Sequence, residues 1–248
     1  MKNMQPFFEQ NPKVAIAFSG GVDSAFLLYL ANKYAKEVKA YYVQSSFQPA
    51  FELADARKLC EEMGVLLQVL EVDVMCNPKV IRNHSDRCYF CKKVIFERIR
   101  QAAQEDNIQI LLDGTNASDD AGDRPGMKAL EELNVLSPLR EYGYTKDDIR
   151  SGSKEAGLFV FDKPAYACLA TRIPYETKIT KEMLMQIEEA ENVMFSLGFK
   201  DFRVRVLQNM AKLQLSESQL PLFVEKRKII YEKLSKWFEE IVLDVKTR

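Results

Sequence analysis

Histidine is nearly missing from this sequence, in which His84 is the single example. A Ser-His-Asp triad built elsewhere in the chain and a His-rich zinc site are therefore both excluded. Long apolar runs are missing as well, since none reaches the roughly 18 residues that a membrane-spanning helix needs. Residues 1–13 hold no apolar core of signal-peptide length. We therefore expect no membrane partner.

Cysteine is also scarce, with five among 248 residues. An odd number in a chain of this length is not typical of a disulfide scaffold. We expect a reduced, cytoplasmic setting, in which clustered cysteines are metal ligands or nucleophiles.

Neither sign of charge is in excess, because 35 Lys and Arg face 36 Asp and Glu, for a net charge of −1. This balance argues against a protein that mainly wraps nucleic acid or coats an anionic membrane. Hydrophobic residues make up 47% and charged residues 29%, which excludes a largely disordered chain. The length predicts one large domain, or one domain plus a small one.

Short apolar runs alternate with helical patterns over the first two-thirds of the chain. The runs typical of buried strands are residues 13–19, 38–43, 66–73, 108–113 and 158–161. The helical patterns are residues 25–34, 52–63 and 89–104. This alternation predicts an α/β fold, in which helices flank a parallel sheet and ligands bind at the carboxyl ends of the strands.

The pattern changes after about Pro164. The later segments are a helix at 180–196 that ends at Gly198, strands at 201–207 and 211–215, a helix from Pro221 and a strand at 241–245. This order predicts a small α+β unit. We divide the chain into an α/β domain, residues 1–170, and a C-terminal α+β domain, residues 171–248, that binds substrate or forms oligomers.

A glycine-containing loop lies between the first predicted strand and the first helix. It consists of Ser19, Gly20, Gly21, Val22, Asp23 and Ser24. Helix amides at such a position have no internal partner and favour a phosphate, and glycines let the backbone approach it closely. Asp23 is a candidate ligand of Mg²⁺. The alternative is a tight turn with a capping serine.

This loop is neither a Walker loop nor the GxGxxG of dinucleotide-binding proteins. It resembles the SGGxDS signature of the PP-loop ATP pyrophosphatases. The resemblance implies that the loop binds the pyrophosphate part of ATP. It also implies that a substrate oxygen attacks the α-phosphate, and that nitrogen or sulfur then displaces AMP.

Three cysteines are candidates for chemistry. Cys88 and Cys91 are three residues apart at the start of a predicted helix, so both thiols lie on one face, close to Arg87 and other basic residues that favour thiolate. Cys168 follows the predicted strand 158–161. A single CxxC is also compatible with a redox pair, half a zinc site or chance. Three thiolates suit a [4Fe–4S] cluster with one open iron.

The other two cysteines, Cys60 and Cys76, are expected to be structural.

A closer resemblance covers residues 14–215. Its motifs are DRCYFCKK at 86–93, DGTNASDD at 113–120 with RPG at 124–126, SPL at 137–139, KP at 163–164 and ACLATRIPYETKIT at 167–180. In these motifs the chain resembles the LarE family. These ATP-dependent sulfur transferases adenylate a carboxylate of pyridinium-3,5-biscarboxylic acid mononucleotide and install sulfur, in the biosynthesis of the nickel-pincer nucleotide cofactor.

The family has two branches, and the resemblance assigns this chain to one of them. One branch sacrifices the sulfur of a single cysteine, to which Cys168 corresponds. The other holds an iron–sulfur cluster on three cysteines, here Cys88, Cys91 and Cys168. The implied cofactors are ATP, Mg²⁺ and a [4Fe–4S] cluster. The implied partners are a small nucleotide substrate and a downstream nickel-inserting enzyme, and we expect a homo-oligomer.

Further polar residues are weighed against an ordinary surface role. Arg203 and Arg205 share one face of a strand, where they either bind the substrate phosphate or are surface charge. Arg172, close to Cys168, is expected to be catalytic and to contact substrate or AMP. Gly114 and Thr115 are placed at the other side of the nucleotide.

Acidic residues of the 113–123 segment are candidate Mg²⁺ ligands or ordinary solvated charges. They are Asp113, Asp119, Asp120 and Asp123, of which Asp113, at a strand end, is the strongest candidate. His84 is expected to face solvent.

Two alternatives to the LarE-type activity remain. One is a tRNA thiolase of the same superfamily, which would need a basic surface that the net charge does not suggest. The other is a non-enzymatic nucleotide-binding protein with a structural zinc site.

Overall fold

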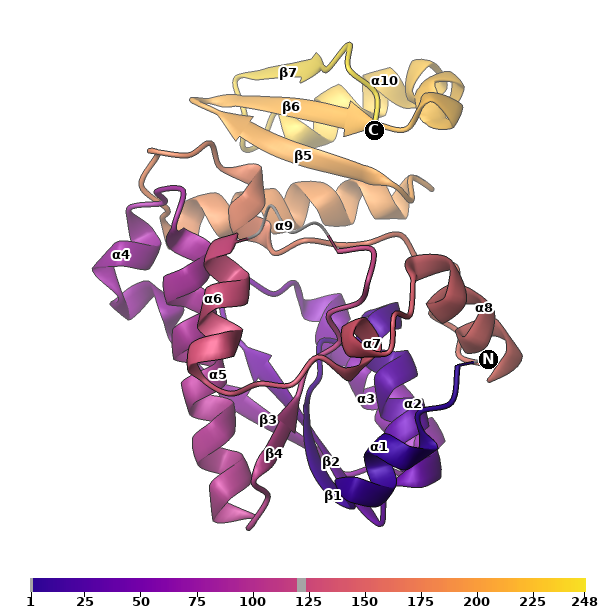
Figure 1. The fold of residues 1–248 in the computed structure, drawn as a ribbon. Coiled ribbons are helices and arrows are strands. Elements are labelled where there is room, and N and C mark those ends of the chain that lie inside the picture. Colours follow the sequence, from indigo (N-terminus) through magenta and orange to yellow (C-terminus); the bar gives the residue numbers. More distant parts are fainter. Residues whose placement is uncertain (1, 120–123) are drawn as a thin grey trace. The chain divides into compact units, whose positions relative to one another are not determined.

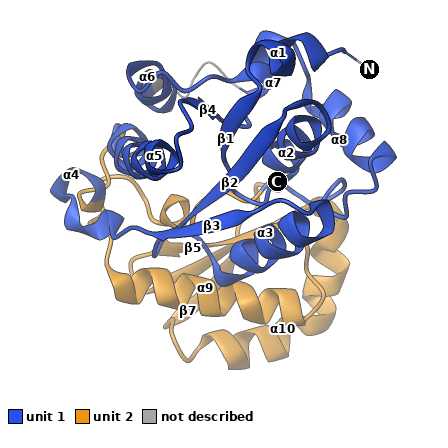
Figure 2. Cartoon of the chain, turned by 90° about the horizontal axis from the view of Figure 1, so that it is seen from below, with its two compact units in different colours: residues 1–80, 86–165 blue, residues 81–85, 166–248 orange. Residues whose placement is uncertain are grey.

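The computed structural model describes residues 2–119 and 124–248. The chain forms two compact units, one of residues 1–80 and 86–165 and one of residues 81–85 and 166–248 (Figure 2). The domain division at residue 170 stays a prediction. Within the described parts of the chain, no helix is both long and apolar enough to cross a membrane.

The first unit contains a four-stranded parallel sheet, whose strands are labelled in Figure 1. The strand order is β3-β2-β1-β4, which Figure 2 shows. The strands are β1 (Lys13–Ala17), β2 (Glu37–Gln44), β3 (Leu67–Glu71) and β4 (Ile110–Leu112). The helices are α1 (Gln5–Gln10), α2 (Val22–Tyr34), α3 (Ala50–Met63), α4 (Pro78–Ile81), α5 (Arg87–Glu105), α6 (Arg124–Glu132), α7 (Pro138–Glu141) and α8 (Lys146–Glu155). The predicted α/β class is confirmed.

Alternation along β1 explains why helices cover both faces of this sheet. Val14 and Ile16 point into a core with α2 and α3, whereas Ala15 belongs to a second core with α5 and α6. Side chains of a strand point alternately to its two faces, so a strand that is apolar at every position is buried on both. Figure 2 shows α2 and α3 on one side of the strands and α5 and α6 on the other.

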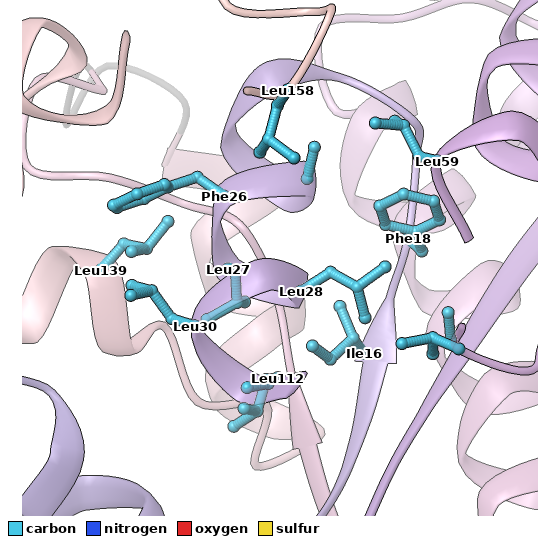
Figure 3. Close-up of a cluster of buried hydrophobic side chains, with 14 of the residues drawn as sticks. Ile16, Phe18, Phe26, Leu27, Leu28, Leu30, Leu59, Leu112, Leu139 and Leu158 are labelled. Carbon is cyan, nitrogen blue, oxygen red and sulfur yellow. The ribbon is translucent and has the colours of Figure 1, made fainter. Parts of the chain in front are cut away.

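Helix α2 is packed by the larger of these cores. Phe26, Leu27 and Leu30 are at most 2% exposed, and they lie among side chains from β1, β4, α7 and the segment after α8 (Figure 3). A buried side chain of this size contributes roughly 1.5–3 kcal/mol to folding. The packing fixes the first turn of α2, and with it the glycine loop, at the carboxyl end of β1.

That end of β1 is also where the strand order changes direction. From β1 the chain moves outward to β2 and β3, and β4 then returns to the opposite side of β1. In open α/β sheets this topological switch point is where ligands bind. The loop at residues 19–24 therefore occupies the position that the fold favours for a ligand.

The strand expected at residues 158–161 is not present, and this prediction was wrong. These residues form turns, in which the Phe161 amide donates to the Leu158 carbonyl at 3.1 Å. Leu158 and Val160 are buried in the core next to α2. The apolar pattern therefore reflected burial of a turn, and it gives no support for a strand that leads to the Cys168 segment.

The second unit is built on a three-stranded sheet in the order β5-β6-β7. Its elements are α9 (Lys181–Ser196), β5 (Phe202–Leu207), β6 (Met210–Leu215), α10 (Leu220–Leu234) and β7 (Glu240–Leu243). Strands β5 and β6 are antiparallel and turn at Gln208 and Asn209, while β6 and β7 are parallel. The small α+β unit that the sequence predicted is therefore present.

Candidate functional site

The glycine loop is ordered by its own serines. The Ser24 hydroxyl donates to the Gly21 carbonyl at 3.1 Å and accepts from the Ser19 amide at 3.3 Å. The Ser19 hydroxyl accepts from the Gly21 amide at 3.3 Å. No side chain caps the start of α2, so its first-turn amides remain available to an anion.

The two glycines of the loop have different roles. Gly20 has φ +75, and a Cβ atom there would lie 3.0 Å from the Glu52 carbonyl oxygen and 3.2 Å from the Ala56 nitrogen, both in α3. Gly21 has φ −76, and a Cβ atom there would approach only the Ser19 hydroxyl, at 3.4 Å. Gly20 is therefore required by the fold, whereas the space in front of Gly21 is open.

The segment after β4 packs directly on this loop. A Cβ atom at Gly114 would lie 2.9 Å from the Ser24 nitrogen, so a larger residue cannot fit there. Asp113 is buried and accepts hydrogen bonds from Thr115 Oγ1 at 2.5 Å and Ser137 Oγ at 2.6 Å. Burial raises the pKa of Asp113, although these hydrogen bonds oppose the rise. The structure places Asp113 and Thr115 in one hydrogen-bonded turn beside the loop.

Asp23, the acidic residue of the loop, has two partners in the first unit. Its Oδ1 accepts from the Asn116 side-chain amide at 3.2 Å, and its Oδ2 forms an ion pair with Lys146 of α8. Asn116 is fully buried, and its backbone amide donates a hydrogen bond to Asp119 Oδ2 at 2.9 Å. Asp119 therefore closes a turn around Asn116.

The remaining acidic candidates, Asp120 and Asp123, lie outside the described residues.

Cys88 and Cys91 lie in the first turns of α5, both partly exposed. The buried Arg87 guanidinium donates a hydrogen bond to Cys88 Sγ at 3.7 Å. The two aromatic residues between the cysteines have packing partners: Tyr89 donates to Glu132 at 2.6 Å, and Lys79 lies 4.4 Å from the Phe90 ring centre. The helix therefore presents two adjacent thiols from a fixed turn.

The other cysteines of the first unit differ in exposure. Cys60 is buried in the core, where burial raises the pKa of its thiol to about 12. Cys76 is exposed and donates to Asp73 at 3.4 Å.

Cys168, in the second unit, is partly exposed and precedes a short 3-10 helix at Leu169–Arg172. Arg172 is 1% exposed, and its Nη1 donates to the carbonyls of Ala167 at 2.6 Å and Cys168 at 3.2 Å. The Thr171 hydroxyl also donates to the Cys168 carbonyl, at 2.8 Å. Arg172 therefore binds the backbone carbonyls on both sides of the Cys168 Cα atom.

Glu191 of α9 balances the charge of Arg172. The pair is bidentate, with Nε to Oε1 at 2.9 Å and Nη2 to Oε2 at 3.1 Å. Glu191 also accepts from the Val204 amide of β5 at 3.0 Å and from the Tyr166 hydroxyl. Burial, and then the charge of Glu191, raises the pKa of Tyr166. One buried carboxylate thus joins α9, β5 and the Cys168 segment.

Arg203 and Arg205 lie close to this group on β5. Two guanidinium groups lie over the ring of Tyr166. That of Arg172 is 4.3 Å from the ring centre, and that of Arg203 is 5.0 Å from it. Burial, followed by the charge of Arg172, lowers the pKa of Arg203 to about 10. Arg205 donates to the Thr171 carbonyl at 2.8 Å, and burial and Arg172 lower its pKa as well.

Three guanidinium groups therefore gather around a single buried carboxylate, Glu191. Guanidinium groups that are gathered in this way and partly removed from water suit an anionic ligand such as a phosphate. Asp244 adds one partly exposed negative charge near Arg205. The arginines of β5 are therefore an anion-binding candidate in the second unit.

Several residues of these sites carry no sequence motif that would reveal them. Lys146, Tyr166 and Glu191 are single residues of common types in helices or loops, and only the fold gives them their partners. His84 is exposed, as predicted, and its Nδ1 lies 2.6 Å from Glu176. Among residues 2–119 and 124–248, no group of three His, Cys, Asp or Glu side chains is close enough to hold a metal ion.

Comparison with known proteins identifies the family. Residues 1–123 match the model of a PP-loop domain. The chain is 34% identical over 227 residues to an uncharacterized protein of Synechocystis, covering 91% of this chain and 84% of the relative. It is 32% identical over 214 residues to the pyridinium-3,5-bisthiocarboxylic acid mononucleotide synthase of Lactiplantibacillus plantarum, covering 86% of this chain and 78% of the relative.

A more distant similarity involves a tRNA-modifying enzyme. The chain is 24% identical over 193 residues to the tRNA-specific 2-thiouridylase MnmA of Thermotoga petrophila, covering 61% of this chain and 54% of the relative. The similarity to the synthase is both higher and more extensive. The chain therefore belongs to the LarE family of PP-loop proteins and is an ATP-dependent enzyme of sulfur transfer.

Proposed function

We propose that this protein adenylates a carboxylate of pyridinium-3,5-biscarboxylic acid mononucleotide and replaces a carboxylate oxygen by sulfur. The observation that carries the proposal is the 32% identity to the synthase of the bisthiocarboxylic product, over 86% of this chain. The product would serve the biosynthesis of a nickel-pincer nucleotide cofactor, and a nickel-inserting enzyme would be the next to act on it.

The ATP half of the reaction is assigned to the loop at residues 19–24. The open amides of α2 would bind the phosphates, and Asp23 would hold Mg²⁺ between them. A carboxylate oxygen of the substrate attacks the α-phosphorus, an O–P bond forms, and the bond to the β-phosphate oxygen breaks to release pyrophosphate. Gly114 packs against the backbone of Ser24 and would cover one side of this loop.

The substrate half is assigned to the arginines of β5. The substrate carries a phosphate and two carboxylates, and Arg203 and Arg205 offer one buried and one half-buried guanidinium group to such anions. Arg172 is assigned a positioning role, since its guanidinium is engaged with Glu191 and with the backbone around Cys168. In the second step a sulfur nucleophile attacks the acyl carbon, and the bond to AMP breaks.

The sulfur is assigned to a [4Fe–4S] cluster on Cys88, Cys91 and Cys168. Cys88 and Cys91 suit such a group, because both are partly exposed on one turn of α5 with the Arg87 guanidinium beside the first thiol. Cys168 supplies a third partly exposed thiol. A cluster bound through three thiolates would leave one iron able to bind sulfide.

Substrate-dependent release of pyrophosphate tests the proposal. With ATP, Mg²⁺, sulfide and the biscarboxylic mononucleotide, we expect pyrophosphate and AMP to form. We also expect a product whose mass exceeds that of the mononucleotide because sulfur has replaced oxygen. Pyrophosphate that forms equally without the mononucleotide would contradict this substrate.

A tRNA thiolase is the second candidate, favoured by the similarity to MnmA. It predicts that tRNA, and not the mononucleotide, stimulates pyrophosphate release. A gel-shift assay with unmodified tRNA separates the two candidates, and the net charge of −1 leads us to expect no shift.

A further inference from the structure

The glycine loop has no cation of its own. A Walker loop contains a lysine that reaches the β- and γ-phosphates, but residues 19–24 include neither Lys nor Arg, and their one charged member, Asp23, is negative. A triphosphate next to this carboxylate would meet repulsion unless another element supplied positive charge. The fold supplies one such charge, Lys146.

Lys146 reaches the loop from a separate helix. Its ammonium forms an ion pair with Asp23 Oδ2, although 123 positions separate the two residues in the sequence. Both side chains are partly accessible, at 29% for Lys146 and 26% for Asp23. The pair therefore lies at the edge of the loop, where a bound phosphate could reach it.

The backbone of Lys146 is fixed while its side chain can change partner. Its amide donates to Ser118 Oγ at 2.9 Å, and Thr145 and Asp148 form a capping box around the start of α8. A lysine has a flexible four-carbon stem and three donors. A small rotation of that stem can therefore move the ammonium from a carboxylate to a neighbouring phosphate without displacing α8.

Asp23 has a second partner that remains when Lys146 leaves. The buried Asn116 donates to its Oδ1 at 3.2 Å and keeps the carboxylate oriented. Oδ2 would then be open to Mg²⁺, which prefers carboxylate oxygens. The same exchange thus frees a cation for the phosphates and an oxygen for the metal ion.

We propose that Lys146 is an ATP-binding residue that exchanges Asp23 for a phosphate oxygen of ATP when the nucleotide and Mg²⁺ bind. This assignment rests on the proposed function of the glycine loop. It also gives the free enzyme an internal counterion, because Lys146 occupies the position at Asp23 that the metal ion takes later.

Calorimetric titration with ATP and Mg²⁺ tests this role. Lys146→Met and Lys146→Gln should each weaken ATP binding roughly ten- to a hundredfold, the range expected for one charge-assisted hydrogen bond. Lys146→Gln retains a donor for Asp23, so it covers the case in which Lys146→Met does not fold. Lys146→Arg should restore much of the affinity. Lys154→Met, on the same helix with its ammonium 5.9 Å from the Phe161 ring centre, is the matched control.

A second measurement uses Mn²⁺ alone as a probe of Asp23. Without nucleotide, Lys146→Met should bind Mn²⁺ more tightly than the wild type, because the competing ammonium is gone. ATP affinity within about twofold of the wild type in both Lys146→Met and Lys146→Gln would overturn the assignment and leave the proposed function intact. A wild-type protein that binds no ATP would overturn both.

Discussion

At the scale of single residues, the sequence predicts a phosphate-binding role for the loop at residues 19–24 but not how its two glycines differ. The SGGVDS run identifies residues 19–24 because glycines, serines and an acidic residue follow a buried strand. That Gly20 needs a positive φ and a close approach to α3, while Gly21 does not, depends on the position of Glu52 and Ala56. No local pattern encodes that distance.

Valine at Gly21 should abolish ATP binding while the protein stays folded. The backbone at Gly21 suits any residue, and its Cβ position is open, so the added methyl groups would occupy space in front of the α2 amides. Calorimetry with ATP and a thermal melt measure both effects. Retained ATP affinity in a folded Gly21→Val protein would remove the loop from the phosphate site.

Alanine at Gly20 is the matched comparison. At a φ of +75, any residue other than glycine destabilises the folded state by roughly 1–2 kcal/mol. The close contact of the new Cβ atom with the Glu52 carbonyl oxygen adds to this destabilisation. We therefore expect Gly20→Ala to lower the melting temperature, in contrast to Gly21→Val. Equal melting temperatures in the two variants would show that the positive φ of Gly20 and its contact with α3 do not affect stability.

At the scale of helices and strands, periodicity predicts the long elements well. The helix expected at 180–196 is α9, and the strands expected at 201–207 and 211–215 are β5 and β6. Short helices such as α7 and α8 were not predicted, because few residues carry their pattern. The false strand at 158–161 has the same origin: four apolar residues can be buried as a turn as readily as in a sheet.

The link between α9, β5 and the Cys168 segment should depend on Glu191. In Glu191→Leu the buried Arg172 loses its carboxylate, and breaking a buried ion pair by removing one partner costs about 3–5 kcal/mol. Urea unfolding followed by the fluorescence of Trp237, the single tryptophan and part of the second unit, measures the loss.

Glu189→Leu makes the same substitution at an exposed position of the same helix. Its free energy of unfolding should stay within about 0.5 kcal/mol of the wild type. Similar unfolding midpoints for the Glu191 and Glu189 variants would mean that the buried pair does not hold the second unit together.

At the scale of the whole molecule, the candidate chemistry is divided between the two units. The glycine loop, Cys88 and Cys91 belong to the first, whereas Cys168 and the arginines of β5 belong to the second. The motifs in the sequence predict both groups of residues, since each has its own local pattern. Because the proposed sulfur transfer uses residues of both units, its test requires the intact protein.

The cysteines give the decisive prediction at this scale. If Cys168 alone donated its sulfur, Cys88 and Cys91 would be dispensable, and the spent protein would lose the mass of one H₂S as cysteine became dehydroalanine. If three thiolates hold a cluster, each sulfur stays on the chain and an open iron can bind supplied sulfide.

We expect Cys88→Ala, Cys91→Ala and Cys168→Ala each to lose the brown iron–sulfur absorbance and sulfur transfer after anaerobic purification. Cys76→Ala, at an exposed cysteine, should keep both. Dehydroalanine at position 168 after turnover, with full activity in Cys88→Ala, would instead establish the sacrificial route.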